Sequence, residues 1–159
     1  MGYRLRKAKP DEIDKISELW YELAVMHEDI MEGYELREDP LTPWKNYIKE
    51  GMESGRLVTF VADEGGKIIG FVNVMIRNRA SFFTVQKMGV IMDTFVREDY
   101  RRKGVGSALV HAAERWIKNQ GVEVAVLTVA PENTSGVKFW RKKGFKTYLY
   151  KQRKELDRS

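Results

Sequence analysis

Hydrophobic and polar positions change their period several times along the chain, and each change predicts a new element. Apolar residues three and four apart predict a helix that starts at Pro10-Asp11-Glu12, because proline and acidic residues suit a first helical turn. Its buried stripe would be Ile13, Ile16, Leu19, Trp20, Leu23 and Met26. The same period predicts helices over 44–53, from the loop at 101–107 to about Gln120, and over 133–143.

Alternating or continuous apolar runs predict strands over residues 3–8, 57–62, 68–76, 90–96, 122–129 and 145–151. Gly65-Gly66 would form a tight hairpin turn between the second and third strands, since glycine accepts the positive φ that such a turn needs. Residues 78–86 are expected to form a loop or an irregular strand end. The order β-α-α-β-β-β-α-β-α-β predicts a mixed α/β fold with one domain over residues 1–159.

Composition narrows the classes of function. The 159 residues suffice for one ordinary core, and the complete absence of cysteine excludes disulfides, Cys-ligated zinc and a Cys nucleophile. The two histidines, His27 and His111, are too far apart for a ligand pair, so no metal site is expected. We expect a cytoplasmic protein without a membrane span, because no apolar run approaches the ~18 residues of one.

The net charge of +5 favours an anionic partner. Nucleic-acid binding is the third hypothesis for this charge and is not preferred, since most charge of this kind is a solvated surface. Positive charge is concentrated in one stretch, Arg101-Arg102-Lys103-Gly104-Val105-Gly106-Ser107. It follows a predicted strand and opens a predicted helix, whose first N–H groups have no internal partner and carry partial positive charge. Glycine lets the backbone approach a phosphate closely, so a phosphate-bearing ligand is predicted.

Three phosphate motifs compete for this loop. A Walker loop needs a lysine after its last glycine, which Gly106-Ser107-Ala108 lacks. A dinucleotide fingerprint needs a third small residue, where Leu109 stands, and an early βαβ unit. The pattern Arg/Gln-x-x-Gly-x-Gly is matched by Arg101, Gly104 and Gly106.

With this pattern the sequence resembles the GNAT-type N-acetyltransferase superfamily. The run Phe95-Val96-Arg97-Glu98-Asp99-Tyr100-Arg101 to Leu109 is similar to its acetyl-CoA-binding segment, and Asn133 to Phe145 is similar to its second signature. Two motifs at the right separation are more specific than either alone. The resemblance implies a single GNAT-like domain, whose central twisted sheet has about six mixed, mostly antiparallel strands flanked by four helices.

The resemblance also implies a donor and a reaction. Acetyl-CoA would place its pyrophosphate on the N–H groups of residues 102–107, and its pantetheine arm beside a strand that is splayed from the next. Acetyl would pass directly to a primary amine of a small molecule, peptide or protein, with a backbone N–H near Val96 polarising the thioester. The implied cofactor-binding residues are Thr94, Phe95, Val96, Arg101, Arg102, Lys103, Gly104, Val105, Gly106, Ser107, Asn133 and Trp140.

Acid, base and acceptor are less defined. Asp93 is the one carboxylate within the strand before the loop and is the candidate base, although a structural hydrogen-bonding role stays open. Trp140 stands where the family has its acidic tyrosine, so Tyr148 is the candidate acid, with Tyr100, Tyr150 or solvent as alternatives. This departure also favours an alternative function, a non-catalytic acyl-CoA-binding or regulatory module.

Two expectations concern surfaces. The acidic run from Glu28 to Asp39 lies where the first helices of the family shape the acceptor cleft, and it either attracts a cationic amine or is a solvated loop. Trp44, Tyr47, Phe82 and Phe83 either line an acceptor pocket or pack in the core. Because only about fifteen residues follow Gly144, we expect one final strand with an exposed edge that a second subunit covers in a homodimer.

Overall fold

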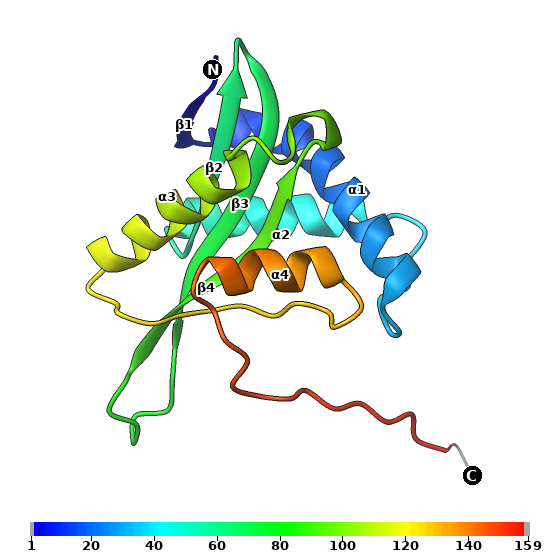
Figure 1. Cartoon of the computed structure of the whole chain (residues 1–159), viewed down its shortest axis with the longest axis vertical. Coiled ribbons are helices and arrows are strands. Elements are labelled where there is room, and N and C mark those ends of the chain that lie inside the picture. The colour runs from blue at the N-terminus through cyan, green and yellow to red at the C-terminus, as the bar shows by residue number, and fades with distance from the viewer. Residues whose placement is uncertain (1, 158–159) are drawn as a thin grey trace.

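The structure, a computed structural model, describes residues 2–157 and consists of one sheet with helices on both faces (Figure 1). The strands are β1 (Arg4–Lys7), β2 (Leu57–Glu64), β3 (Lys67–Asn78), β4 (Lys87–Val96) and β5 (Ala125–Val126). The helices are α1 (Ile13–Ile30), α2 (Leu41–Ser54), α3 (Val105–Asn119) and α4 (Thr134–Lys142), with short 3-10 turns η1 (Pro10–Glu12) and η2 (Glu98–Tyr100). The predicted mixed α/β class is confirmed.

The five strands lie in sequence order, antiparallel from β1 to β4 and parallel between β4 and β5. The β2–β3 turn is the predicted Gly65-Gly66 pair, with φ of 57° and 93°, between the paired residues Glu64 and Lys67. Between β3 and β4 the register slips once. Val72 faces Thr94 and Val74 faces Ile91, so β4 contains one extra residue opposite Asn73, which is a β-bulge.

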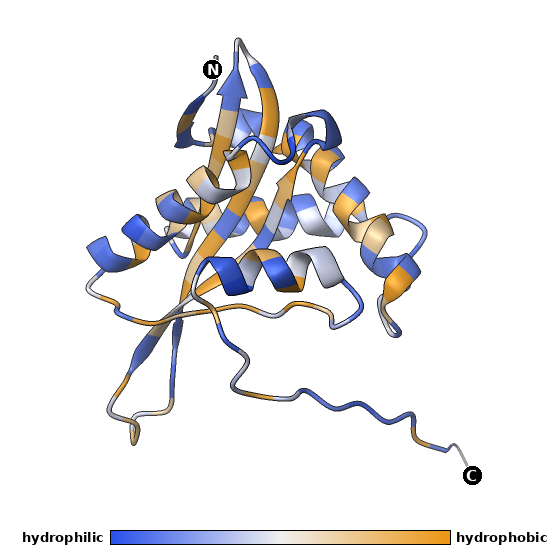
Figure 2. Cartoon of the chain, viewed as in Figure 1, coloured by the Kyte–Doolittle hydropathy of each residue, from blue (hydrophilic) through white to orange (hydrophobic). Residues whose placement is uncertain are grey.

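Two hydrophobic clusters lie on opposite faces of the sheet. The face covered by α1 and α2 buries Ile16, Leu19, Trp44, Ile48, Phe71 and Phe95, among others. The face covered by α3 buries Leu109, Ala113, Ile117, Val72, Val74 and Ile91, among others, and Trp140 of α4 packs against it. Figure 2 shows the resulting pattern, in which the central strands are largely orange and the helices carry blue on their outer sides.

The end of the chain differs from the prediction. Residues 145–151 form no strand, and the run 122–129 forms only the two-residue strand Ala125–Val126, so the sheet has five strands rather than about six. Both segments have strand-forming side chains, but a strand exists only where its backbone finds a partner, and no further strand borders β5 among residues 2–157. The loop predicted at 78–86 is confirmed over 79–86, since β3 ends at Asn78 and β4 begins at Lys87.

One ion cluster ties the N-terminus to the sheet. Arg6 of β1 donates to both carboxylate oxygens of Glu12 at 2.8 and 2.6 Å, and to Asp63 of β2 at 3.0 Å. Asp63 also accepts from the backbone N–H of Gly66 at 2.8 Å, so the same cluster holds the β2–β3 turn. The hydrogen bonds from Arg6 lower the pKa of Glu12 to about 2.

The Glu12→Gln variant tests this cluster. Because the pKa of Glu12 is lower in the folded than in the unfolded chain, its stabilising contribution is present above the unfolded pKa and is lost as pH falls toward about 2. We expect the variant to lose about 2 kcal/mol of unfolding free energy at neutral pH and to show a smaller decline on acidification. Urea denaturation at several pH values measures both quantities, and the exposed Glu18→Gln is the control. A neutral-pH stability equal to that of the unmodified protein would contradict the role of the cluster.

Candidate functional site

The outer edge of β4 is the main opening in the sheet. β5 pairs with β4 only at Gly89 and Val90, with one further bond from the Gly89 N–H to the Val124 carbonyl at 2.8 Å. Residues 91–96 of β4 therefore present a strand edge that no other strand of residues 2–157 occupies. The Thr94 hydroxyl is buried and has no hydrogen-bond partner within the described chain. A buried polar atom beside a free edge indicates a place for a polar ligand.

The loop after this edge presents a row of backbone donors. The first hydrogen bond that closes α3 runs from the Ala108 N–H to the Gly104 carbonyl at 3.0 Å. Among residues 2–157 no acceptor lies within hydrogen-bonding geometry of the N–H groups of residues 102–107. Arg102 and Gly104 adopt positive φ, of 63° and 85°, and so bend the loop into the helix. Six consecutive free N–H groups at a helix start are suited to a phosphate.

Cations flank this row. Arg101, Arg102 and Lys103 are all exposed in the loop itself. Arg101 is partly engaged, because its Nε donates to the Val96 carbonyl at 2.8 Å and its guanidinium lies 5.0 Å from the Phe95 ring centre. The Lys103 ammonium lies 5.8 Å from the Tyr100 ring centre. The predicted residues of the first motif therefore combine exposed cations with the row of free N–H groups.

Helix α4 borders the same loop. A Cβ placed on Gly106 would stand 3.4 Å from the Phe139 ring, which puts the first turn of α3 against α4. Asn133 is the N-cap of α4, and its Oδ1 accepts from the Gly136 N–H at 3.0 Å. Trp140 is half-buried between the rings of Phe139 and Phe145, at 5.0 and 5.4 Å between ring centres. Both predicted residues thus have evident structural roles next to the loop.

Asp93 lies on β4 at the bulge and on the face covered by α1 and α2. Its Oδ2 accepts from Asn73 Nδ2 at 3.1 Å. Burial raises the pKa of Asp93, and the hydrogen bond from Asn73, the Trp44 side chain and the charge of His27 oppose that rise. His27 of α1 is half-buried, and burial lowers its pKa more than the Asp93 charge raises it. A half-buried carboxyl with a raised pKa beside an opening is suited to proton transfer.

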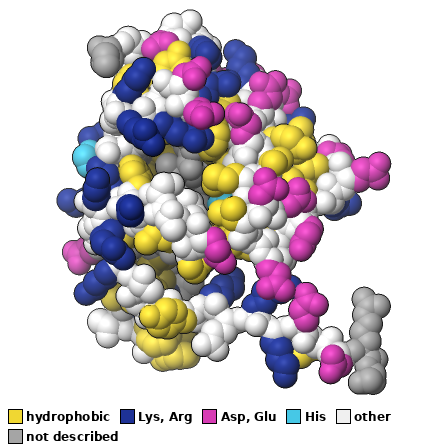
Figure 3. All heavy atoms as spheres, turned by 45° about the vertical axis from the view of Figure 1, so that its right-hand side comes forward, with side chains coloured by type: hydrophobic (Ala, Val, Ile, Leu, Met, Phe, Trp, Pro, Cys, Tyr) yellow, Lys and Arg dark blue, Asp and Glu magenta, His cyan; other side chains and the backbone are white. Residues whose placement is uncertain are grey.

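Charge is divided between the two sides of the molecule. Figure 3 shows Asp and Glu gathered mainly on the right of the view and Lys and Arg mainly on the left. Part of the acidic run serves structure, since Glu28 accepts from the Leu36 N–H at 2.7 Å and Glu32 pairs with Arg153 at 3.1 Å. Of the four candidate aromatic residues, Trp44 is buried and stacks on Trp20 at 5.0 Å, whereas Tyr47, Phe82 and Phe83 are exposed.

The candidate phenols are either exposed or engaged with other residues. Tyr148 follows α4 in a segment without regular secondary structure, and 63% of its surface is exposed. Tyr150 is still more exposed. The Tyr100 hydroxyl donates to Glu64 at 2.7 Å, and this bond raises the pKa of Tyr100. Tyr100 is therefore engaged with β2, and only the tail tyrosines have unengaged hydroxyls among these candidates.

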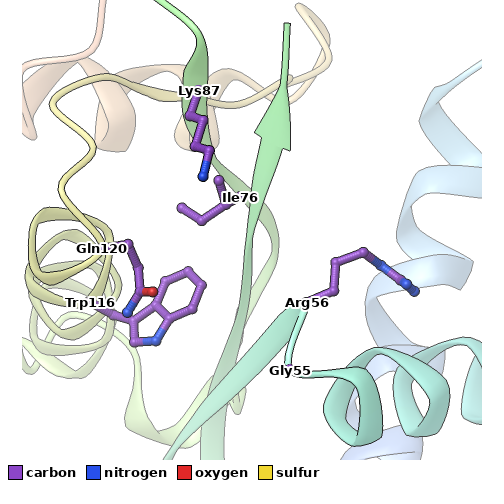
Figure 4. Close-up of a pocket in the computed structure, with 6 residues that line it drawn as sticks. All are labelled: Gly55, Arg56, Ile76, Lys87, Trp116 and Gln120. Atoms are coloured by element: carbon purple, nitrogen blue, oxygen red, sulfur yellow. The ribbon is translucent and has the colours of Figure 1, made fainter.

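Two hollows in the surface lie away from these residues. One, of about 190 Å³, is lined by Gly55, Arg56, Ile76, Lys87, Trp116 and Gln120 (Figure 4). The other, of about 290 Å³, lies between η1 and α2. Neither is lined by Asp93 or by the glycine loop. Within residues 2–157 no three acidic or imidazole side chains gather as metal ligands would, and no helix has the length and apolar character that crossing a bilayer requires.

The sequence did not identify the surroundings of Asp93. Thr59 and Asn73 occupy positions of β2 and β3 whose neighbours on the same face, Leu57, Val61 and Phe71, are apolar and buried. A polar residue at an inward position of an alternating strand was the available signal. Its meaning depends on the pairing of strands, which sets Asn73 opposite the bulge.

Comparison with known proteins gives the site a context. Residues 20–145 match the model of the acetyltransferase (GNAT) family. An N-alpha-acetyltransferase of Sulfurisphaera tokodaii is 26% identical over 91% of this chain and 80% of its own length. An uncharacterized N-acetyltransferase of Methanocaldococcus jannaschii is 27% identical over 90% of this chain, which spans 60% of that relative. A predicted acetyltransferase with acetyl-CoA from Clostridium acetobutylicum has a similar fold, with a TM-score of 0.80 at 18% identity, covering 98% of this chain and 96% of that one.

Arg102 tests the shape of the loop. Within residues 2–157 it is the one non-glycine residue with positive φ, a conformation in which Cβ crowds the backbone at a cost of about 1 kcal/mol. We expect Arg102→Gly to unfold at a higher temperature than Arg102→Ala, since both lose the charge but only glycine relieves the crowding. Thermal unfolding by calorimetry compares the two variants, and equal midpoints would contradict the strained loop.

Proposed function

Since the chain belongs to the acetyltransferase (GNAT) family, we propose that it transfers acetyl from acetyl-CoA to a primary amine. The observation that carries this proposal is the junction of the free β4 edge with the row of N–H groups at residues 102–107. The β4 edge accepts a peptide-like chain as an added strand would, and the row of N–H groups accepts phosphate. The acceptor is a small molecule, peptide or protein amine, and the N-alpha-acetyltransferase name of one relative fits the protein end of that range.

At the donor end, the backbone and three cations would hold the cofactor. The N–H groups of residues 102–107 would bind the pyrophosphate, with Arg101, Arg102 and Lys103 adding charge. The edge formed by Thr94, Phe95 and Val96 would pair with the pantetheine arm, and the Thr94 hydroxyl would gain the partner it lacks. Asn133 and Trp140 would border the arm from α4. Bound acetyl-CoA supplies an activated acetyl thioester.

At the acceptor end, Asp93 would take the proton that the amine must lose. The amine nitrogen forms a bond to the acetyl carbon while the carbon–sulfur bond breaks, and a backbone N–H near Val96 would polarise the carbonyl. The acidic residues of the α1–α2 loop would attract a cationic amine before this step. Tyr148 is proposed as the acid for the departing sulfur, and its place in an irregular segment means that this segment must approach the site.

Titration calorimetry with acetyl-CoA tests the donor site. We expect binding by the unmodified protein and an affinity about tenfold lower or worse in Gly106→Val, a loss of at least about 1.4 kcal/mol. A Cβ on Gly106 would meet the Phe139 ring at 3.4 Å, so the branched valine side chain would crowd the contact between the first turn of α3 and α4, and thermal unfolding checks that the variant folds. Arg115→Ala removes an exposed cation farther along α3 and should bind normally. Unchanged affinity in Gly106→Val would refute the role of the loop.

A non-catalytic acyl-CoA-binding module is the second candidate, and Trp140 favours it because indole cannot serve as the acid. Thiol release from acetyl-CoA against a panel of primary amines separates the two functions. Turnover with any amine supports the transferase. Tight binding without turnover across the panel supports the module instead.

A homodimer in the cytoplasm completes the proposal. β5 is a short edge strand, and Tyr148, Leu149 and Tyr150 after α4 are exposed apolar side chains in a segment with strand-forming residues. Light scattering coupled to size exclusion should give twice the chain mass, and Leu149→Asp should shift it toward the monomer. Lys151→Ala is the matched control in the same segment. A monomer mass for the unmodified chain would exclude the dimer.

A further inference from the structure

Three polar side chains form a hydrogen-bonded chain on the face of the sheet covered by α1 and α2. Thr59 of β2 donates to Asn73 of β3, and Asn73 Nδ2 donates to Asp93 of β4 at 3.1 Å. The exposed fractions of Thr59 and Asn73 are 2% and 0%. A buried amide without hydrogen-bond partners would cost about 1–3 kcal/mol of stability, so the polar groups of this chain must bond to one another.

The direction of the bonds orients the amide. A threonine hydroxyl that donates to Asn73 Oδ1 leaves the Nδ2 of the same amide directed at Asp93. The opposite orientation would set the amide oxygen against the carboxylate, which is repulsive. Thr59 therefore acts on Asp93 through Asn73, although it lies two strands away.

The backbone brings Asn73 to this point. The extra residue of β4 stands opposite Asn73, so the bulge and the hydrogen bond occur at the same register position. The groups that face Asp93 come from each packed element: His27 from α1, Trp44 from α2 and Asn73 from β3. Asn73 has a hydrogen-bond partner, Thr59, that is itself buried and fixes the orientation of the amide.

We infer that Asn73, oriented by Thr59, is the positioning residue that holds the Asp93 carboxylate for proton transfer from the acceptor amine. This inference rests on the proposed function, in which Asp93 is the base. Asn73 touches neither donor nor acceptor in this role. It acts by keeping Asp93 ionised and in one orientation at the bulge, because a hydrogen bond to the charged form favours that form.

The pH profile distinguishes positioning from simple packing. Without the donor of Asn73, burial of Asp93 is opposed less, so its pKa rises and a higher pH is needed for the ionised base. In Asn73→Leu we expect the acidic limb of kcat/KM for acetyl transfer to move about one unit to higher pH, which is about a tenfold loss on that limb. Thr59→Val should move the limb in the same direction by less, and Thr59→Ser, which keeps the hydroxyl, should leave it in place.

Val74→Ala is the control for lost packing. Val74 is fully buried, adjacent in sequence and on the opposite face, so its truncation should lower stability without moving the limb. A carbon-13 NMR titration of the Asp93 carboxyl, assigned with Asp93→Asn, provides a readout that needs no turnover. If Asn73→Leu folds poorly, the Thr59→Val and Thr59→Ser pair decides the same question.

The outcomes separate the two claims. The inference is supported if the acidic limb of the pH profile and the titration of the Asp93 carboxyl both move to higher pH in Asn73→Leu and Thr59→Val. Neither should move in the controls. Turnover with an unmoved limb overturns it while the transferase stands. Binding of acetyl-CoA without any turnover defeats the proposed catalysis and with it the catalytic role of Asn73, whatever the NMR titration shows.

Discussion

The incomplete pairing of β4 is the constraint on which the arrangement of this molecule depends. Along one edge eight residues of β4 pair with β3, and along the other only two pair with β5. The paired edge anchors the strand in the sheet, and the helices on both faces bury its side chains. The free edge leaves backbone polar groups whose hydrogen-bonding capacity must be met from outside the sheet. A rigid strand with unmet backbone groups is a preformed half of a binding site.

The two ends of the unpaired segment of β4, residues 91–96, lie near groups that favour ligands of opposite charge. Beyond its end, the helix start and the cations of the loop favour an anion. At the bulge, Asp93 and the acidic side of the α1–α2 region favour a cation. Side chains alternate across the strand, yet the bulge alters that alternation at one point and places Asp93 among α1 and α2. Within a few residues, one strand thereby separates the anion-favouring loop from the cation-favouring carboxylate.

The sequence predicted the local features of the fold well, including the loop that precedes α3. Gly65-Gly66, the apolar stripe of α1 and the glycine loop before α3 each depend on neighbours within a few positions, and the structure has all three. The strands expected at 122–129 and 145–151 depended on partners that local pattern cannot supply, and only two residues of them are paired. The hydrogen-bonded chain from Thr59 through Asn73 to Asp93 joins positions 34 apart in the numbering, so it follows from sheet register and not from any motif.

The bond between Arg101 and the Val96 carbonyl has a consequence for recognition. In the free protein this guanidinium already satisfies an acceptor on the open edge of β4, and its flat face lies over Phe95. A carbonyl oxygen has two lone pairs, so a strand-like ligand can bond to this carbonyl either beside the guanidinium or in its place. A guanidinium that gives up this bond stays next to the helix start, where it would add charge to the proposed phosphate site. One arginine therefore links the two halves of the proposed donor site, the strand edge and the phosphate-binding loop.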